Sequence, residues 1–153
     1  MPSEFIQRQK NDFFRDSSAL GSLLFYCFLL MFLFLIKEFY LFKRLFFGFV
    51  LIYAATILIR TFYFKERPKR FNYNSYIEKL DASSFPSLHA SRITFLSISL
   101  MNYFKNIYLY FGLSVLALLV CYSRVYLKKH DFADVIAGVV FGVGIYYSIQ
   151  ALI

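Results

Sequence analysis

Residues 107–153 read IYLYFGLSVLALLVCYSRVYLKKHDFADVIAGVVFGVGIYYSIQALI, which is two apolar runs joined by a short polar segment. The runs, Ile107–Tyr122 and Phe132–Ile153, are long enough to cross a bilayer as helices. Four polar residues lie at fixed spacing around the junction: Ser123, Arg124, His130 and Asp134. The stretch therefore predicts two membrane helices whose adjoining ends carry a cluster of polar side chains.

The composition of the whole chain agrees with a membrane protein. Its 153 residues suit one domain, and they are 59% apolar and only 17% charged, against about a quarter charged in soluble domains. Three further stretches can span a membrane: Leu20–Ile36, Leu45–Phe64 and Pro86–Phe104. We expect an all-α polytopic bundle of about five transmembrane helices, with residues 20–153 forming a single domain.

The first 19 residues precede the first apolar run. They show no removable signal peptide, because they mix polar and aromatic residues and no small-residue cleavage site follows. Ile6 and Phe13 are seven residues apart, with Phe5 and Phe14 near them among basic residues, which suits a helix lying on the bilayer surface. A disordered tail is the alternative, and the sequence leaves both open.

Two arginines end the second predicted span. If the helices alternate across the bilayer, the ends of the second and fourth and the starts of the third and fifth share one membrane face. Arg60 and Arg67 are seven residues apart, two turns along one helical stripe, and Pro68 is expected to end that helix. An arginine inside an apolar run needs an anionic partner, since an unpaired charge there costs about 3 kcal/mol or more.

The third span begins with Pro86-Ser87-Leu88-His89. Pro86 suits the first turn of a helix capped by Ser84 or Phe85, which would leave free N–H groups near Ser87 and Leu88 to bind an anion. His89 would then lie beside the bound group, where it could protonate a departing oxygen. This segment therefore predicts an anion site next to a proton donor.

The last cluster supplies a nucleophile. Arg124 offers a planar fork for phosphate oxygens, and His130 and Asp134 are expected on one helical face, where the carboxylate would orient the imidazole. The acidic and histidine residues lack the spacing of metal ligands, so no metal or other cofactor is expected. The net charge of +8 does not indicate nucleic acid, because the basic residues lie in short loops beside membrane spans.

With these three clusters in this order, the chain resembles the type 2 phosphatidic acid phosphatase and haloperoxidase superfamily, in its integral membrane lipid phosphatase branch, over roughly residues 45–153. The resemblance implies two histidines and one aspartate in catalysis, with roles as nucleophile, general acid and support: His130, His89 and Asp134. It implies phosphate binding by five residues: Arg60, Arg67, Ser87, Leu88 and Arg124. Two positions depart from the family pattern, since Arg60 replaces a lysine and Leu88 a glycine.

The resemblance implies hydrolysis of a lipid phosphate ester in the bilayer, such as a polyprenyl diphosphate or phosphatidate, through a phosphohistidine. A lipid phosphotransferase of the same fold and a non-catalytic lipid-binding protein remain alternatives, and the oligomeric state is open. Of the 17 Lys and Arg residues, four fall on the membrane face opposite the predicted site: Lys37, Lys43, Arg44 and Lys105. Because basic residues concentrate on the cytoplasmic side of a membrane protein, this count favours a cytoplasmic site. Resemblance to envelope-lipid phosphatases favours an extracytoplasmic site in the cell membrane, which we expect.

One small-residue pair lies within the last span. Gly138 and Gly142 are spaced as G-x-x-x-G, which lets another helix approach closely. We expect the approaching helix to belong to the same bundle, with dimerisation as the lesser alternative.

Overall fold

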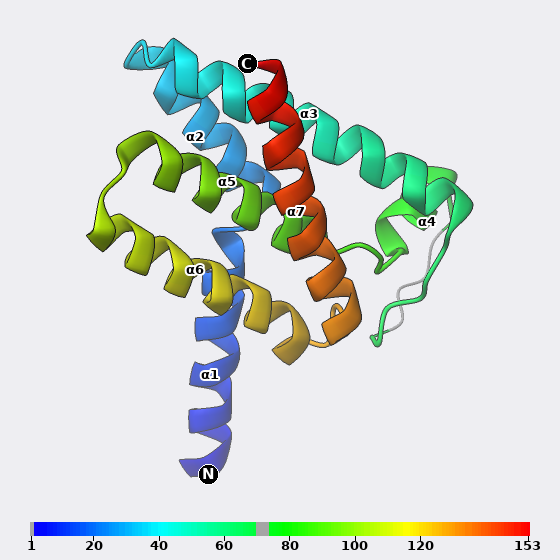
Figure 1. Cartoon of the computed structure of the whole chain (residues 1–153). Coiled ribbons are helices and arrows are strands. Elements are labelled where there is room, and N and C mark those ends of the chain that lie inside the picture. The colour runs from blue at the N-terminus through cyan, green and yellow to red at the C-terminus, as the bar shows by residue number, and fades with distance from the viewer. Residues whose placement is uncertain (1, 70–73) are drawn as a thin grey trace.

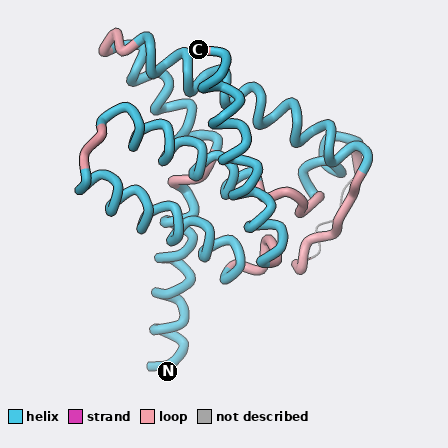
Figure 2. Tube along the Cα trace, viewed as in Figure 1, coloured by secondary structure: helices cyan, strands magenta, loops and turns pink. Residues whose placement is uncertain are grey.

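The computed structural model describes residues 2–69 and 74–153, and every regular element in those ranges is a helix (Figures 1 and 2). The elements in chain order are α1 Pro2–Ala19, α2 Leu23–Leu35, α3 Phe39–Phe62, α4 Tyr76–Ala82, α5 Leu88–Phe104, α6 Ile107–Tyr126 and α7 Phe132–Leu152. The predicted all-α membrane bundle is confirmed.

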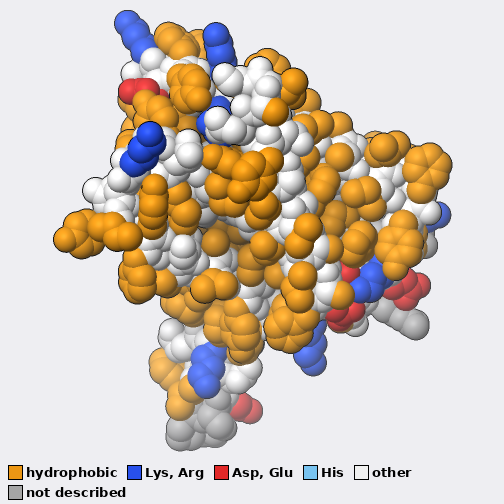
Figure 3. Space-filling view, in the orientation of Figure 1, with side chains coloured by type: hydrophobic (Ala, Val, Ile, Leu, Met, Phe, Trp, Pro, Cys, Tyr) orange, Lys and Arg blue, Asp and Glu red, His pale blue; other side chains and the backbone are white. Residues whose placement is uncertain are grey.

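Helix α5 forms the centre of the bundle, where it packs against α3, α6 and α7 (Figure 1). Its buried residues include Arg92, Phe95 and several serines and a threonine, so its polar surface faces protein. The outer helices instead turn Leu, Phe, Ile and Val side chains outward, and hydrophobic side chains are spread over the face shown in Figure 3. This distribution, with polar groups inside and apolar groups outside, is what a lipid solvent selects.

Helices α5 and α7 approach each other closely at the two spaced glycines. A Cβ atom added to Gly138 would lie 2.6 Å from the Ser87 carbonyl oxygen, and one on Gly142 would lie 2.6 Å from that of Ser91. Only glycine therefore allows the two backbones to approach this closely. The pair serves a contact inside the bundle, as predicted.

Three or four of the expected spans have the length and composition to cross a membrane. By length and composition α3, α6 and α7 can each cross a membrane, and α1 with α2, bent by 42°, can form a fourth span. The expected third span, α5, has 17 residues and a helical rise of roughly 25 Å, below the ~30 Å hydrocarbon core. The count of about five spans stays a prediction, and α5 tolerates polar residues because its neighbours shield it.

The N-terminal residues form a helix, so the disordered-tail alternative is wrong. Helix α1 extends away from the bundle and contacts α6, with the Phe14 ring 4.2 Å from that of Tyr126 between centroids (Figure 1). It ends at Ala19, and Ser22 caps α2 by accepting a hydrogen bond from the Phe25 N–H. The break between them falls at the predicted boundary near residue 20, while the surface position of α1 stays a prediction.

Candidate active site

A cavity of about 310 Å³ brings the three sequence clusters together. It is bounded by residues of α2, α3, α4, α5 and α6 and of two loops: Leu23, Tyr53, Arg60, Arg67, Asp81, Leu88, His89, Arg92, Arg124 and His130. Six of the eight predicted site residues are in this lining, and the other two, Ser87 and Asp134, are fully buried beside it. The predicted convergence at one end of the bundle is therefore observed.

The first cluster reaches the cavity by a different route from the one expected. Helix α3 ends at Phe62, and the extended residue Tyr63 caps it, so Arg67 lies in a loop and Pro68 does not end the helix. The chain is extended there because Lys65 and Glu66 run beside Ser83 and Ser84, with the Ser84 N–H donating to the Lys65 carbonyl at 2.8 Å. The extended conformation of residues 65–66 therefore depends on residues 83–84, which lie 18 positions further along the chain.

The Arg60 guanidinium binds three backbone carbonyls. It donates to Leu80 at 2.9 Å, to Pro86 at 3.0 Å and to Phe85 at 3.3 Å. Arg60 is thus satisfied largely by the chain that connects α4 to α5, and it fixes that connection against α3. Two of its five N–H groups remain after these bonds, and the residue is part of the cavity lining.

Arg67 is partly neutralised by α4. Its Nη2 donates to the Asp81 carbonyl oxygen and lies 3.8 Å from the Asp81 carboxylate, which is largely exposed. Its Nε is buried and has no hydrogen-bond partner in the described residues. One donor of Arg67 is therefore left for a ligand in the cavity.

The second cluster starts its helix later than predicted. Ser87 is the N-cap of α5 and Leu88 its first residue, so Pro86 precedes the helix and Ser84 and Phe85 do not cap it. The Ser87 N–H is not free, because it donates to the Asp134 carbonyl at 3.1 Å. The Ser87 hydroxyl is buried without a partner in the described part of the chain, and Leu88 and His89 supply first-turn N–H groups, which lack intrahelical acceptors.

Leu88 fits the position where the family pattern has glycine. It has ordinary helical backbone angles, since the residues with positive φ in the described chain are Lys37, Lys105 and Lys128. The departure from the pattern therefore introduces no backbone strain, and the leucine side chain becomes part of the cavity wall.

His130 lies in the loop before α7 rather than on the helix. Its Nδ1 is 2.8 Å from the Ser84 carbonyl oxygen and 3.9 Å from the Asp134 carboxylate. Because a carbonyl only accepts, Nδ1 carries the proton and the Nε2 lone pair is left free. Burial, with Arg124 and Arg67 nearby, lowers the pKa of His130 to about 3, so the imidazole is neutral at physiological pH.

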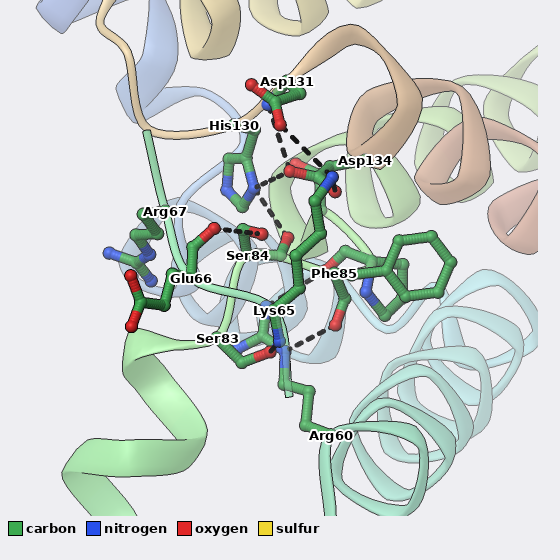
Figure 4. A network of polar contacts seen from close by, with 12 residues as sticks. Arg60, Lys65, Glu66, Arg67, Ser83, Ser84, Phe85, His130, Asp131 and Asp134 are labelled. Atoms are coloured by element: carbon green, nitrogen blue, oxygen red, sulfur yellow. Dashed lines mark hydrogen bonds and ion pairs between the residues drawn. The ribbon is translucent and has the colours of Figure 1, made fainter. Parts of the chain in front are cut away.

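Asp134 is held mainly by Lys65, which the sequence analysis missed. The Lys65 Nζ lies 2.7 Å from Asp134 Oδ1 and 3.2 Å from the Asp131 carboxylate (Figure 4). The Asp134 Oδ2 accepts from the Asp131 N–H at 3.0 Å, which closes a capping box at the start of α7. No sequence signal marks Lys65, because it is one of several basic residues in a polar loop.

Arg92 and Tyr53 also enter the site unpredicted. The Arg92 Nη1 donates to the Tyr53 hydroxyl at 2.6 Å, and Nη2 lies 3.4 Å from His89 Nδ1. Arginine has no acceptor, so Nδ1 must accept and the proton of neutral His89 is on Nε2. The two histidines thus hold opposite tautomers: His130 offers a lone pair at Nε2 and His89 offers an N–H there. A buried arginine in an apolar helix was the signal available for Arg92.

Arg124 is anchored by the N-terminal helix. Its Nη1 donates to the Ser18 hydroxyl at 2.6 Å, and its Nε is buried with no partner in the described residues. These residues also contain no group of three or more His, Cys, Asp or Glu side chains placed to hold a metal ion.

Comparison with known proteins agrees with this geometry. The family model of the PAP2 superfamily matches residues 44–152, and the chain belongs to that superfamily. The crystal structure of LpxE from Aquifex aeolicus has the same fold, with a TM-score of 0.76 and 22% sequence identity over 94% of this chain and 86% of that one. No curated protein matches the chain significantly. The family match and the membrane-length helices agree with the expectation of an integral membrane protein of this superfamily.

Proposed function

We propose that this protein hydrolyses a lipid phosphate ester of the polyprenyl diphosphate or phosphatidate type, with a phosphohistidine at His130 as the intermediate. The observation that carries the proposal is a set of unpaired donors. Arg67 Nε, Arg124 Nε and the Ser87 hydroxyl are buried without partners in the described chain, next to a cavity that His130 and His89 line. A buried unpaired donor costs about 1–3 kcal/mol, and phosphate oxygens would satisfy all three.

The first step transfers a phosphoryl group to the enzyme. The free Nε2 lone pair of His130 attacks phosphorus, an N–P bond forms, and the bond from phosphorus to the lipid oxygen breaks with its electron pair on that oxygen. Arg67 and Arg124 stabilise the equatorial oxygens, as metal ions do in other phosphoryl transferases. The Nε2–H of His89 hydrogen-bonds to the departing oxygen, which takes up a proton from the medium.

The second step returns the enzyme to its starting state. A water molecule attacks the phosphohistidine, a P–O bond forms and the N–P bond breaks, and orthophosphate leaves with one proton of the water passed to the medium. Ser84 accepts from Nδ1 of His130 throughout, and the Asp134 carboxylate compensates the positive charge on the phosphorylated imidazole. The arginines supply the positive charge, and we propose that no metal ion is required.

Phosphate release from purified protein in detergent tests this function. The panel comprises a polyprenyl diphosphate, phosphatidate, phosphatidylglycerol phosphate and a lipid A analogue, each with excess chelator and each with orthovanadate. We expect release that survives the chelator and stops with vanadate, and a labelled phosphoenzyme absent from the His130→Ala variant. Activity lost on chelation and restored by magnesium or zinc would contradict the mechanism. Transfer of phosphate to an added alcohol in preference to water would indicate the transferase alternative.

We further propose that the protein resides in the cell membrane with the cavity at the extracytoplasmic face. The family resemblance supports this orientation, and the distribution of basic residues opposes it.

A further inference from the structure

Arg92 and Tyr53 form the end of the cavity nearest the interior of the bundle. Tyr53 precedes Arg60 by seven residues on α3, a helical rise of roughly 10 Å away from the catalytic end. Arg92 follows His89 by three residues on α5, roughly 4.5 Å in the same direction. The pair therefore lies on the side from which a lipid tail would reach the site.

This inner end has unused hydrogen-bonding capacity and unbalanced charge. Arg92 donates to the Leu88 carbonyl, to Tyr53 and to His89, which leaves two of its five N–H groups. No carboxylate of the described residues pairs with it, and its residue surface is only 3% exposed. The Tyr53 hydroxyl accepts from Arg92, so its own hydrogen is available to a ligand.

The whole cavity is more positive than one phosphate requires. Its lining carries Arg60, Arg67, Arg92 and Arg124 against the single carboxylate of Asp81. Arg92 is the one arginine of this lining that lies outside the three sequence clusters. A diphosphate ester carries roughly one negative charge more than a monophosphate ester.

We propose that Arg92 and Tyr53 bind the phosphate attached to the lipid, and that the substrate is a lipid diphosphate cleaved at its terminal phosphoryl group. This rests on the proposed function and specifies its substrate class. His130 attacks the terminal phosphorus, the bond from that phosphorus to the bridging oxygen breaks, and the electron pair stays on the lipid monophosphate. Arg92 neutralises the charge that develops there.

The tautomer of His89 agrees with this leaving group. A neutral imidazole that donates from Nε2 can hydrogen-bond a departing oxygen but is a weak acid. A lipid monophosphate can leave as an anion without full protonation. The alkoxide released from a monoester needs a proton to leave. The Arg92 contact to Nδ1 therefore suits an anhydride better than a simple ester.

Farnesyl diphosphate and farnesyl monophosphate, which share one tail, provide the test. For Arg92→Gln, kcat/KM on the diphosphate should fall roughly 10- to 150-fold, the equivalent of one hydrogen bond to a charged group, and far less on the monophosphate. Arg92→Lys should recover part of the loss. Arg44→Gln is the matched control, since Arg44 is buried and lies near the opposite end of α3, and it should leave the substrate ratio unchanged.

Tyr53→Phe removes a single oxygen and keeps the test valid if Arg92→Gln does not fold; it should lower the diphosphate preference in the same direction. Equal losses on both substrates in Arg92→Gln or Tyr53→Phe, or no diphosphate preference in the wild type, would overturn the inference. Phosphate release that depends on His130 would still leave the proposed function standing in those cases. Failure to release phosphate from every lipid phosphate would remove the proposed function and this inference with it.

Discussion

The Nζ atom of Lys65 lies 2.7 Å from Oδ1 of Asp134, whereas Nδ1 of His130 lies 3.9 Å from Oδ2 of the same carboxylate. Asp134 is completely buried, so Lys65 is the cation that allows it to remain charged. Its hydrogen bond to Asp134 raises the pKa of Lys65, which keeps the lysine protonated in the range where the enzyme would work. His130 is consequently oriented by the Ser84 carbonyl, and its Nδ1 lies 3.9 Å from the Asp134 carboxylate, beyond hydrogen-bond distance.

Lys65→Met should therefore change catalysis and its pH dependence together. Without Lys65 the Asp134 carboxylate has His130 as its nearest cationic partner, so the imidazolium is favoured and the acid limb of kcat/KM should move to higher pH. We expect a fall of about 10- to 100-fold at neutral pH, the size of a small displacement of a catalytic group. Lys65→Arg should retain most activity. The control is Lys128→Met, an exposed lysine of the loop before α7; a loss in Lys65→Met without a shifted acid limb would show that Lys65 is only structural.

The two histidines should respond differently to the leaving group. His130→Ala removes the attacking nitrogen and should abolish turnover and phosphoenzyme on every substrate. His89→Ala removes a proton donor, so it should cost about 10²- to 10⁴-fold on an alkoxide leaving group and much less on p-nitrophenyl phosphate. Steady-state rates with a lipid monophosphate and the activated ester make the comparison. Equal defects of both variants on both substrates would contradict the assigned division of labour.

Stability should fall in acid because of His130. Burial and the neighbouring arginines hold the pKa of His130 at about 3 in the folded protein, below its ordinary value of 6.5. Between pH 6.5 and 3 the unfolded chain therefore binds a proton at His130 and the folded chain does not. The free energy of unfolding thus has its full value above pH 6.5 and declines as pH falls toward 3. Thermal unfolding in detergent across that range should show the decline in the wild type and a shallower one in His130→Gln. Identical slopes in the wild type and in His130→Gln would mean that a group other than His130 causes the decline.

Close packing of α7 on α5 can be tested with a single methyl group. In Gly138→Ala the new Cβ would lie 2.6 Å from the Ser87 carbonyl, so α5 must shift at the end that carries His89. We expect destabilisation of about 1–3 kcal/mol and a reduced kcat. Gly144→Ala is the matched control on the same helix, since nothing lies within 4 Å of its Cβ. Equal behaviour of the two variants would mean that the contact is looser than described.

Orientation can be read from one cysteine. Asn74→Cys, in a variant with Cys27 and Cys121 replaced by serine, should react with an impermeant thiol reagent in intact cells, because we expect the loop before α4 on the extracytoplasmic face. Labelling that requires opened cells would reverse the orientation.

The sequence predicted which residues come together more accurately than it predicted the helix ends that carry them. Arg60, Arg67, His89, Arg124 and His130 were identifiable because their residue types and spacings are rare, and they do share one cavity. The predicted ends of α3 and the start of α5 were wrong because tertiary hydrogen bonds decide them. Residues 65–66 extend to pair with 83–84, and the Ser87 N–H is drawn to the Asp134 carbonyl.

Residues outside the clusters were missed for a related reason. Lys65 and Ser84 acquire their importance from partners 69 and 46 residues away, and neither is unusual in a polar loop. Arg92 did carry a signal, since it is charged within an otherwise apolar stretch, but only the structure shows that it contacts both Tyr53 and His89.

The polarity of α5 also bears on how the chain is made. Its residues Ser91 and Thr94 lie against Gly142 of α7, which is synthesised after α5. Until α7 arrives, the nascent protein would expose those groups to hydrocarbon. Insertion of α7 therefore has to complete the cover of α5, and a chain truncated before Phe132 should be a substrate for membrane quality-control proteases.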